Sequence, residues 1–318
     1  MSRAAAGWLR DAGVLGMNRR NAEYIMRHNP RFAFPLVDDK LLTKRLAVEY
    51  GVPTPELLHV IAHHGDIAGF EKALEGRTEF VVKPARGSGG SGITLIVDRT
   101  NQGFVKHNGD VVSLEGLAYT LSDILSGIYS LEGREDRAIV ETLVHPDPVF
   151  ASVTYQGVPD IRIVVYRGVP VMAMTRLPTR KSDGKANLHR GAIGAGIDIG
   201  NGRTMAAVHE SRVVSRHPDT GNRVEGITVP FWEAMLLVAA KAHDMTGMGY
   251  LGVDMVLDRD KGPVLLELNA RPGLQIQIAN QGGLRTRLDM TDRAPGDVFL
   301  SPESRVAWAR AAFTTDGP

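Results

Sequence analysis

Residues 251–273 read LGVDMVLDRDKGPVLLELNARPG. Alternating apolar positions predict one strand over 252–257 and a second over 264–269, joined by a polar turn at 258–262. Three oxygen-bearing side chains lie on this hairpin: Asp254, Glu267 and Asn269. Because alternate residues of a strand share a face, Glu267 and Asn269 point to the same side. Carboxylate and amide oxygens favour Mg²⁺ over zinc, so we predict a magnesium site here rather than a sheet edge with solvated charges.

Composition narrows the class of protein. The 318 residues are 43% hydrophobic, which suffices for one large or two to three small domains. A net charge of +1 gives no electrostatic case for a nucleic-acid partner, and the absence of cysteine excludes disulfide and thiolate chemistry. The N-terminus lacks the apolar core of a signal peptide, and no apolar run approaches the roughly 18 residues of a membrane span. A soluble, cytoplasmic protein without a membrane span is therefore expected.

A glycine-rich loop at 85–92 lies between predicted strands at 79–84 and 93–97. The order strand, loop, strand differs from the strand, loop, helix of a P-loop or dinucleotide-binding fold. It predicts a loop that folds over phosphates with backbone N–H donors, and Lys83 just before it can add a point charge. A plain hairpin linker is the alternative.

The rest of the chain is predicted to alternate helices and strands. Two lysines, Lys40 and Lys44, share one face of a helix over 38–50 that Asp38 or Asp39 caps; taken alone they would be surface lysines. A strand over 138–144 ends before a proline-rich segment, where exposed backbone groups suit a flat heterocycle. Further helices are predicted at 1–35, 66–74, 114–131, 230–246 and 304–313.

Two strands with arginines precede the opening hairpin. Residues 160–166 and 169–176 are predicted to pair, so that Arg162 and Arg176 point the same way; a surface charge row is the alternative. A long polar loop follows at 179–196, and loops of this kind are often functional, though some are simply mobile.

In this order, the features resemble the ATP-grasp superfamily of carboxylate–amine ligases over residues 38–281. The stretches NLHRG (187–191), GVDM (252–255) and ELNARPGL (267–274) look like the glutamate ligases that extend the C-terminus of ribosomal protein S6. GMNRRN (16–21) and VDDK (37–40) are similar to the α-L-glutamate ligase-like proteins. Two departures stand out: S6-type ligases carry a larger N-terminal domain, and they tend to have a small residue where this chain has Arg271.

The resemblance implies an α+β fold, with two lobes whose antiparallel sheets sandwich ATP. The expected divisions are an N-terminal helical segment (1–37), an N-terminal lobe (38–143), a C-terminal lobe with the Mg²⁺ site (144–284) and a C-terminal tail (285–318).

The resemblance also implies residue roles. Lys40 and Lys83 would contact the ATP phosphates, the glycine loop would close over them, residues 141–144 would hold adenine, and Asp147 is a weaker candidate for the ribose. The implied nucleotide-binding residues are Lys40, Lys83, Gly87, Ser88, Gly89, Gly90, Ser91, Gly92, Glu141, Thr142, Leu143, Val144 and Asp147. Asp254, Glu267 and Asn269 would bind Mg²⁺, as two ions, with Mn²⁺ as an alternative. Arg162, Arg176 and Arg190 would face the transferred phosphate and the carboxylate substrate.

The implied activity is ATP-dependent amide formation through an acyl phosphate, which joins glutamate or another amino acid to a peptide, protein or small-molecule acceptor. Asp160 or His189 could take a proton from the amine, although surface or structural roles suit both equally. Two alternatives stay open: an ATP-grasp enzyme of cell-envelope or sugar-linked modification, and a nucleotide-binding module without turnover. Homo-oligomerisation is also left open.

Overall fold

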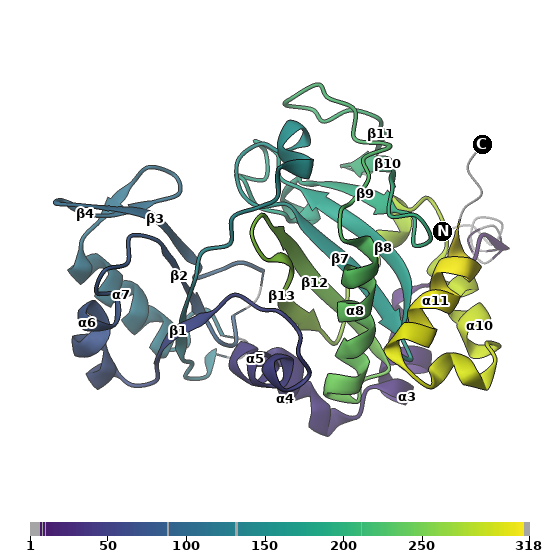
Figure 1. Cartoon of the computed structure of the whole chain (residues 1–318), viewed down its shortest axis with the longest axis horizontal. Coiled ribbons are helices and arrows are strands. Elements are labelled where there is room, and N and C mark those ends of the chain that lie inside the picture. The colour runs from purple at the N-terminus through teal and green to yellow at the C-terminus, as the bar shows by residue number, and fades with distance from the viewer. Residues whose placement is uncertain are drawn as a thin grey trace. The chain divides into compact units, whose positions relative to one another are not determined.

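A computed structural model of the chain describes residues 7, 9, 11–87, 89–130, 133–210 and 212–314 (Figure 1). Within these residues the chain forms two compact units. The larger unit falls within 1–38, 45–53 and 146–318, and the smaller unit within 39–44 and 54–145. Each unit has its own antiparallel sheet and its own buried core, so the predicted α+β class is confirmed.

The sheet of the larger unit has seven strands in the order β11-β10-β9-β8-β7-β12-β13, each antiparallel to its neighbours. Of the two predicted hairpins, β7–β8 lies within this sheet and β12–β13 lies at one edge of it. Their observed bounds extend slightly beyond the predicted ones because the pairing continues up to each turn. The strands are β7 Asp160–Tyr166, β8 Val169–Leu177, β9 Ile193–Ile197, β10 Thr204–His209, β11 Arg212–Val214, β12 Tyr250–Asp258 and β13 Gly262–Asn269.

Helix α8 (Trp232–Thr246) packs along β7, β8, β12 and β13, and its buried residues lie almost all round it, as predicted. It ends at Gly247, whose φ of +67° is a left-handed conformation that favours glycine. The other helical elements of this part are η5 Pro148–Val153, η6 Leu188–Arg190, α9 Ile276–Ala279, α10 Leu284–Asp292, η7 Gly296–Phe299 and α11 Pro302–Phe313. Among helices of the described residues, none combines the length and apolarity that spanning a bilayer requires.

A short N-terminal helical segment precedes α5, as predicted. It comprises α2 Met17–Arg19, the π-helix η1 Arg20–Ile25, α3 Met26–His28, η2 Arg31–Ala33 and α4 Phe34–Asp38. Asn29 attaches the segment to the sheet, because its amide accepts from Tyr250 N (2.9 Å) and donates to Tyr250 O (2.7 Å). These are the two hydrogen bonds that a neighbouring strand would make at the start of β12.

The smaller unit has a six-stranded antiparallel sheet in the order β1-β6-β2-β3-β4-β5. Three rings, those of Phe70, Phe80 and Phe104, stack edge to face in its core. Its strands are β1 Leu57–Ile61, β2 Phe80–Pro84, β3 Thr94–Thr100, β4 Gly103–Lys106, β5 Val111–Val112 and β6 Ala138–Glu141, and its helices are η3 His64–Gly69, α6 Phe70–Ala73 and α7 Leu114–Leu125.

Some predicted boundaries were wrong. Helix α7 ends at Leu125 rather than at Leu131, which lies outside the described residues; Gly127 adopts φ +81°, a conformation that stops a helix. The helix predicted over 38–50 is present as α5 (Lys40–Glu49) and begins two residues later than predicted, because Asp38 ends α4. The Asp39 carboxylate caps α5 by accepting from Leu41 N at 3.0 Å.

Candidate functional site

One face of the β12–β13 hairpin carries the three residues that the sequence singled out. Asp254 and Glu267 are directly paired across the hairpin, and Asn269 follows two residues later on the same face. The Asn269 amide donates to Asp254 Oδ2 (3.1 Å) and to Glu267 Oε1 (3.4 Å). The antiparallel register therefore brings the three polar groups within hydrogen-bonding distance of one another.

The arginines of β7 and β8 lie on this same face. Arg162 donates from Nε to Asp254 Oδ1 (2.7 Å) and from Nη2 to Asp254 Oδ2 (2.5 Å). Arg176 donates to Asp254 Oδ2 (3.0 Å) and also forms a two-point ion pair with Asp160. The prediction that both arginines point the same way is confirmed, and the structure adds two carboxylate partners that pattern alone did not supply.

Burial and charge set the protonation of this cluster. Burial alone would raise the pKa of Asp254, which is 1% exposed, but the guanidinium groups of Arg162 and Arg176 hold that pKa well below its usual range. Burial raises the pKa of Asp160 to about 6 in spite of Arg176, and the nearby charge of Asp254 adds to the rise. With all groups ionised, the two guanidinium groups face the three carboxylates of Asp160, Asp254 and Glu267, which leaves one negative charge.

The donor set fits a hard divalent cation. Asp254 Oδ1 accepts from Arg162 Nε, and the Asp254 carboxylate pairs across the hairpin with Glu267 and accepts from the Asn269 amide. The excess negative charge also has the sign that such an ion requires. The set on this hairpin is two carboxylates and one amide; among the described residues, no group of three His, Cys, Asp or Glu side chains is placed to hold a metal.

The glycine loop of the smaller unit is tied down at its base. Lys40 Nζ donates to Gly87 O at 2.6 Å, and Arg86 N donates to both carboxylate oxygens of Asp136. A Cβ on Gly87 would lie 2.2 Å from Pro84 Cγ, so a side chain has no room there.

Beyond its base the loop opens. Gly89 and Gly90 are exposed and have φ values of +64° and +76°, and a Cβ added to either would meet no atom within 4 Å. Gly92 has φ +73°, and a Cβ there would lie 2.6 Å from the Tyr129 ring. The neighbouring Ser91 is exposed, and Ser88, which the sequence also places in this loop, lies outside the described residues.

Lys83 and Glu141 lie next to this loop on adjacent strands. Lys83 Nζ is 2.5 Å from Glu141 Oε2, and Lys44 Nζ is 2.9 Å from Glu141 Oε1. Burial alone would raise the pKa of Glu141, but Lys83 and Lys44 hold it below its ordinary value. Lys44 is 8% exposed, so interpreting it as a surface lysine was wrong; only its spacing of four from Lys40 hinted that it belongs with that residue.

The segment after β6 carries the residues predicted to hold adenine and ribose. Thr142 extends the pairing of β6, because its N–H donates to Glu56 O and its hydroxyl accepts from Glu56 N. Leu143 and Val144 are half-buried beyond the strand end.

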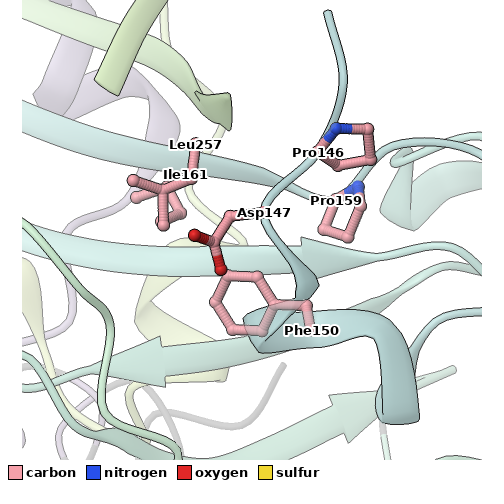
Figure 2. A pocket seen from close by; sticks show the side chains of 6 residues that line it. All are labelled: Pro146, Asp147, Phe150, Pro159, Ile161 and Leu257. Atoms are coloured by element: carbon pink, nitrogen blue, oxygen red, sulfur yellow. The ribbon is translucent and has the colours of Figure 1, made fainter. Parts of the chain in front are cut away.

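Asp147 belongs to the larger unit and lines a small pocket there (Figure 2). Its Oδ1 accepts from Val149 N at 2.8 Å, which caps η5. Figure 2 shows its carboxylate among apolar neighbours, so it is the polar group of the pocket, which is lined by Pro146, Asp147, Phe150, Pro159, Ile161 and Leu257.

Some predicted site residues make no described contact with the cluster of arginines and carboxylates on β7, β8, β12 and β13. Arg190 is exposed at the end of η6, and none of the contacts described for the cluster involves it. His189, beside it, is also exposed. The side chain of Arg271 lies over the Phe34 ring, 4.8 Å from its centre, and Arg20 Nη1 donates to Pro272 O at 2.8 Å. The N-terminal segment therefore supports the chain just after Asn269.

Residues 19–293 match the protein family described as sugar-transfer associated ATP-grasp. Among solved structures, the chain is similar to the ATP-grasp ligase PsnB complexed with minimal precursor (12% identity, 83% of this chain and 63% of that chain covered, TM-score 0.42). It is also similar to the D-alanine–D-alanine ligase of Bacillus anthracis (13% identity, 90% and 72% covered, TM-score 0.46). A third is the RimK domain ATP-grasp protein of Sphaerobacter thermophilus DSM 20745 (16% identity, 82% and 69% covered, TM-score 0.46).

The chain spans less than two thirds of the length of the PsnB chain. Likenesses this distant do not identify a substrate. None of the curated proteins matches the chain in sequence.

Proposed function

The chain belongs to the sugar-transfer associated ATP-grasp family, and on that premise we propose that it is an ATP-dependent ligase that joins a carboxylate to an amine. The observation that carries the proposal is the cluster on β7, β8, β12 and β13. It places three carboxylates, two guanidinium groups and an amide on one face of one sheet. Such a cluster suits a reaction in which a metal ion and several anionic groups must be neutralised together.

The chemistry explains why so much charge is needed. A carboxylate is a poor acyl donor because oxide cannot leave at neutral pH. In the proposed reaction the carboxylate oxygen attacks the γ-phosphorus of ATP and ADP leaves. The amine then attacks the acyl carbon and phosphate leaves. No protein nucleophile is required, and the task of the protein is to orient the groups, balance their charge and exclude water.

In this proposal the smaller unit contributes the nucleotide contacts. Lys40 and Lys83 bind the phosphates, and the glycine loop donates backbone N–H groups to them. The support is the loop itself: its base is held by Lys40 and Asp136, while Gly89 and Gly90 remain open to solvent. Residues 141–144 bind adenine. Asp147, which belongs to the larger unit, accepts from the ribose hydroxyls in this proposal.

The larger unit contributes the groups that act on the reacting atoms. Asp254, Glu267 and Asn269 would hold Mg²⁺, which when bound supplies positive charge to the triphosphate. Arg162 and Arg176 hold Asp254 in place and add positive charge to the transferred phosphoryl group. Arg190, on its exposed loop, binds the carboxylate substrate, for which glutamate is the first candidate.

The test is release of ADP and phosphate by the purified protein with Mg-ATP and a panel of amino acids and peptides. We expect turnover that depends on one amino acid, with glutamate as the first to examine. Turnover with none of them would count against a peptide-type ligase. Tight ATP binding with no ADP formed in any mixture would instead favour a nucleotide-binding module.

A second candidate substrate class follows from the family description, which associates this family with sugar transfer. The acceptor would then be a sugar-linked or cell-envelope compound instead of a peptide. Mass spectrometry of the product separates the two: an amide-linked amino acid supports the first, and a sugar adduct supports the second.

A single substitution tests the metal assignment. Glu267→Gln removes one carboxylate of the proposed set, so we expect turnover to fall by at least about 100-fold. The matched control is Glu225→Gln, which removes an exposed carboxylate paired with Arg223 away from the cluster and should leave turnover unchanged. Wild-type turnover in Glu267→Gln would refute the assignment.

A further inference from the structure

Lys44 is a buried charge with no part in the nucleotide contacts proposed above. Its ammonium group donates to Thr54 Oγ1 at 3.2 Å and to the Pro55 carbonyl, and it lies 2.9 Å from Glu141 Oε1. Lys44 and Glu141 thus form a buried ion pair. A buried ammonium group is unfavourable unless it is paired, so this placement needs a reason.

Glu141 is shared between two lysines. Its side chain is 3% exposed, and those of Lys44 and Lys83 are 10% and 9% exposed. When ionised, the three side chains together carry a net charge of +1 in a protected environment. An arrangement of this kind suits an incoming anion.

The two lysines differ in how they are placed. Lys83 is on β2 and directly precedes the segment that leads into the glycine loop, whereas Lys44 is on α5 and is fixed by Thr54 and Pro55. Lys83 is therefore the lysine that is placed to move toward a ligand bound by the glycine loop. If it left Glu141 alone, a buried carboxylate would remain without a partner, which is strongly unfavourable.

We infer that Lys44 is a positioning residue that holds the Glu141 carboxylate while Lys83 turns to a phosphate group of the nucleotide. This inference rests on the proposed role of Lys83 in ATP binding. Lys44 touches neither the nucleotide nor the reacting atoms; it acts through Glu141. It keeps the carboxylate neutralised in both states, so binding of the phosphate does not have to break the only ion pair of a buried acid.

A purely structural role for Lys44 is the competing account. In that case Lys44 would only join α5 to the Thr54–Pro55 turn, and the charge of Glu141 would not matter. The two accounts differ in what happens when Glu141 is made neutral. If Lys44 acts through the charge of Glu141, removal of that charge makes Lys44 unnecessary.

The experiment compares four full-length proteins: wild type, Lys44→Met, Glu141→Gln and the double variant. Calorimetry measures the Kd of ATP and of adenosine for each, and thermal melting confirms that each is folded. We expect Lys44→Met to weaken ATP binding by about tenfold, because Lys83 then stays with Glu141. Adenosine binding should change by less than about twofold, because Lys83 still holds Glu141 in place. We expect the double variant to bind ATP within about twofold of Glu141→Gln.

Three results would overturn the inference. One is unchanged ATP affinity in Lys44→Met. Another is a loss of ATP and adenosine binding together, and the third is a double variant that binds ATP about tenfold more weakly than Glu141→Gln. If Lys44→Met does not fold, the comparison of the double variant with Glu141→Gln still decides between the two accounts. A wild-type protein that binds no ATP would instead refute the proposed function on which the inference rests.

Discussion

Replacement of Asp254 by asparagine tests whether the arginines hold this residue before any metal binds. Four N–H groups point at its carboxylate: Nε and Nη2 of Arg162, Nη2 of Arg176 and Nδ2 of Asn269. An amide has one acceptor oxygen, whereas a carboxylate has two. If the asparagine oxygen takes the Oδ2 position, its NH₂ group faces Arg162 Nε, and a buried donor loses its acceptor.

The magnitude follows from these contacts. An unsatisfied buried donor costs about 1–3 kcal/mol, and removal of one partner of a buried ion pair costs about 3–5 kcal/mol in all. The cluster carries one excess negative charge, so the loss of a carboxylate also relieves repulsion between Asp254 and Glu267. We therefore expect Asp254→Asn to lower the free energy of unfolding of the larger unit by about 3 kcal/mol, at the low end of that range.

The assay is urea unfolding in the presence of EDTA, followed by tryptophan fluorescence, because Trp232 and Trp308 belong to the larger unit. The matched control is Glu267→Gln on the same hairpin. Glutamine keeps a side-chain oxygen that can accept the hydrogen bond from Asn269 (3.4 Å), so we expect a change within about 1 kcal/mol. A stability of Asp254→Asn that equals or exceeds that of the wild type in EDTA would refute the reasoning, because Asp254 would then matter only as a metal ligand.

Three further predictions concern other parts of the chain. The pKa of Glu141 is lowered in the folded protein, so its ionisation stabilises the fold above the ordinary pKa of 4.5. That contribution is lost as the pH falls below 4.5. Glu141→Gln should therefore flatten the acid side of a stability–pH curve measured by thermal melting. Arg190→Met should raise the KM of the carboxylate substrate and leave the Kd of ATP unchanged, and equal effects on both would contradict its proposed role. Gly92→Ala should lower the free energy of unfolding by about 1–3 kcal/mol, because its Cβ meets the Tyr129 ring. The control Gly90→Ala has a similar φ and open space, and should cost about 1 kcal/mol. Equal losses in urea unfolding would show that the ring moves aside freely.

The shared face of the site was predictable because side chains alternate along strands. Once 160–166 was paired with 169–176, Arg162 and Arg176 had to point the same way. The same rule placed Glu267 and Asn269 on one face of their hairpin. Consecutive strands joined by short turns carry this information locally, and both hairpins are confirmed.

The partners of the arginines were not predictable in the same way. β7 and β12 are neighbours in the sheet, yet Arg162 and Asp254 are 92 residues apart in sequence. Nothing in either segment alone specifies that these two strands pair, or in which register. The sequence therefore predicted that the arginines point the same way, and could not predict that buried carboxylates hold them.

Lys44 shows a second limit. Helical spacing correctly put it on the same face as Lys40, but spacing does not say whether solvent or protein covers that face. The cover comes from Pro55 and Glu141, which the fold brings to the helix from later in the chain. A charged residue on a helix is usually exposed, so a buried lysine is the kind of feature that only tertiary structure reveals.

The amide of Asn29 extends the sheet past the point where β13 ends. β13 stops at Asn269, opposite Gly252, and the next backbone groups of β12, at Tyr250, hydrogen bond to the side chain of Asn29. One side chain thus closes an edge that would otherwise present a bare N–H and C=O. Open edges of this kind are where sheets of separate molecules join and aggregate. The N-terminal segment therefore satisfies the backbone groups of β12 that β13 no longer reaches.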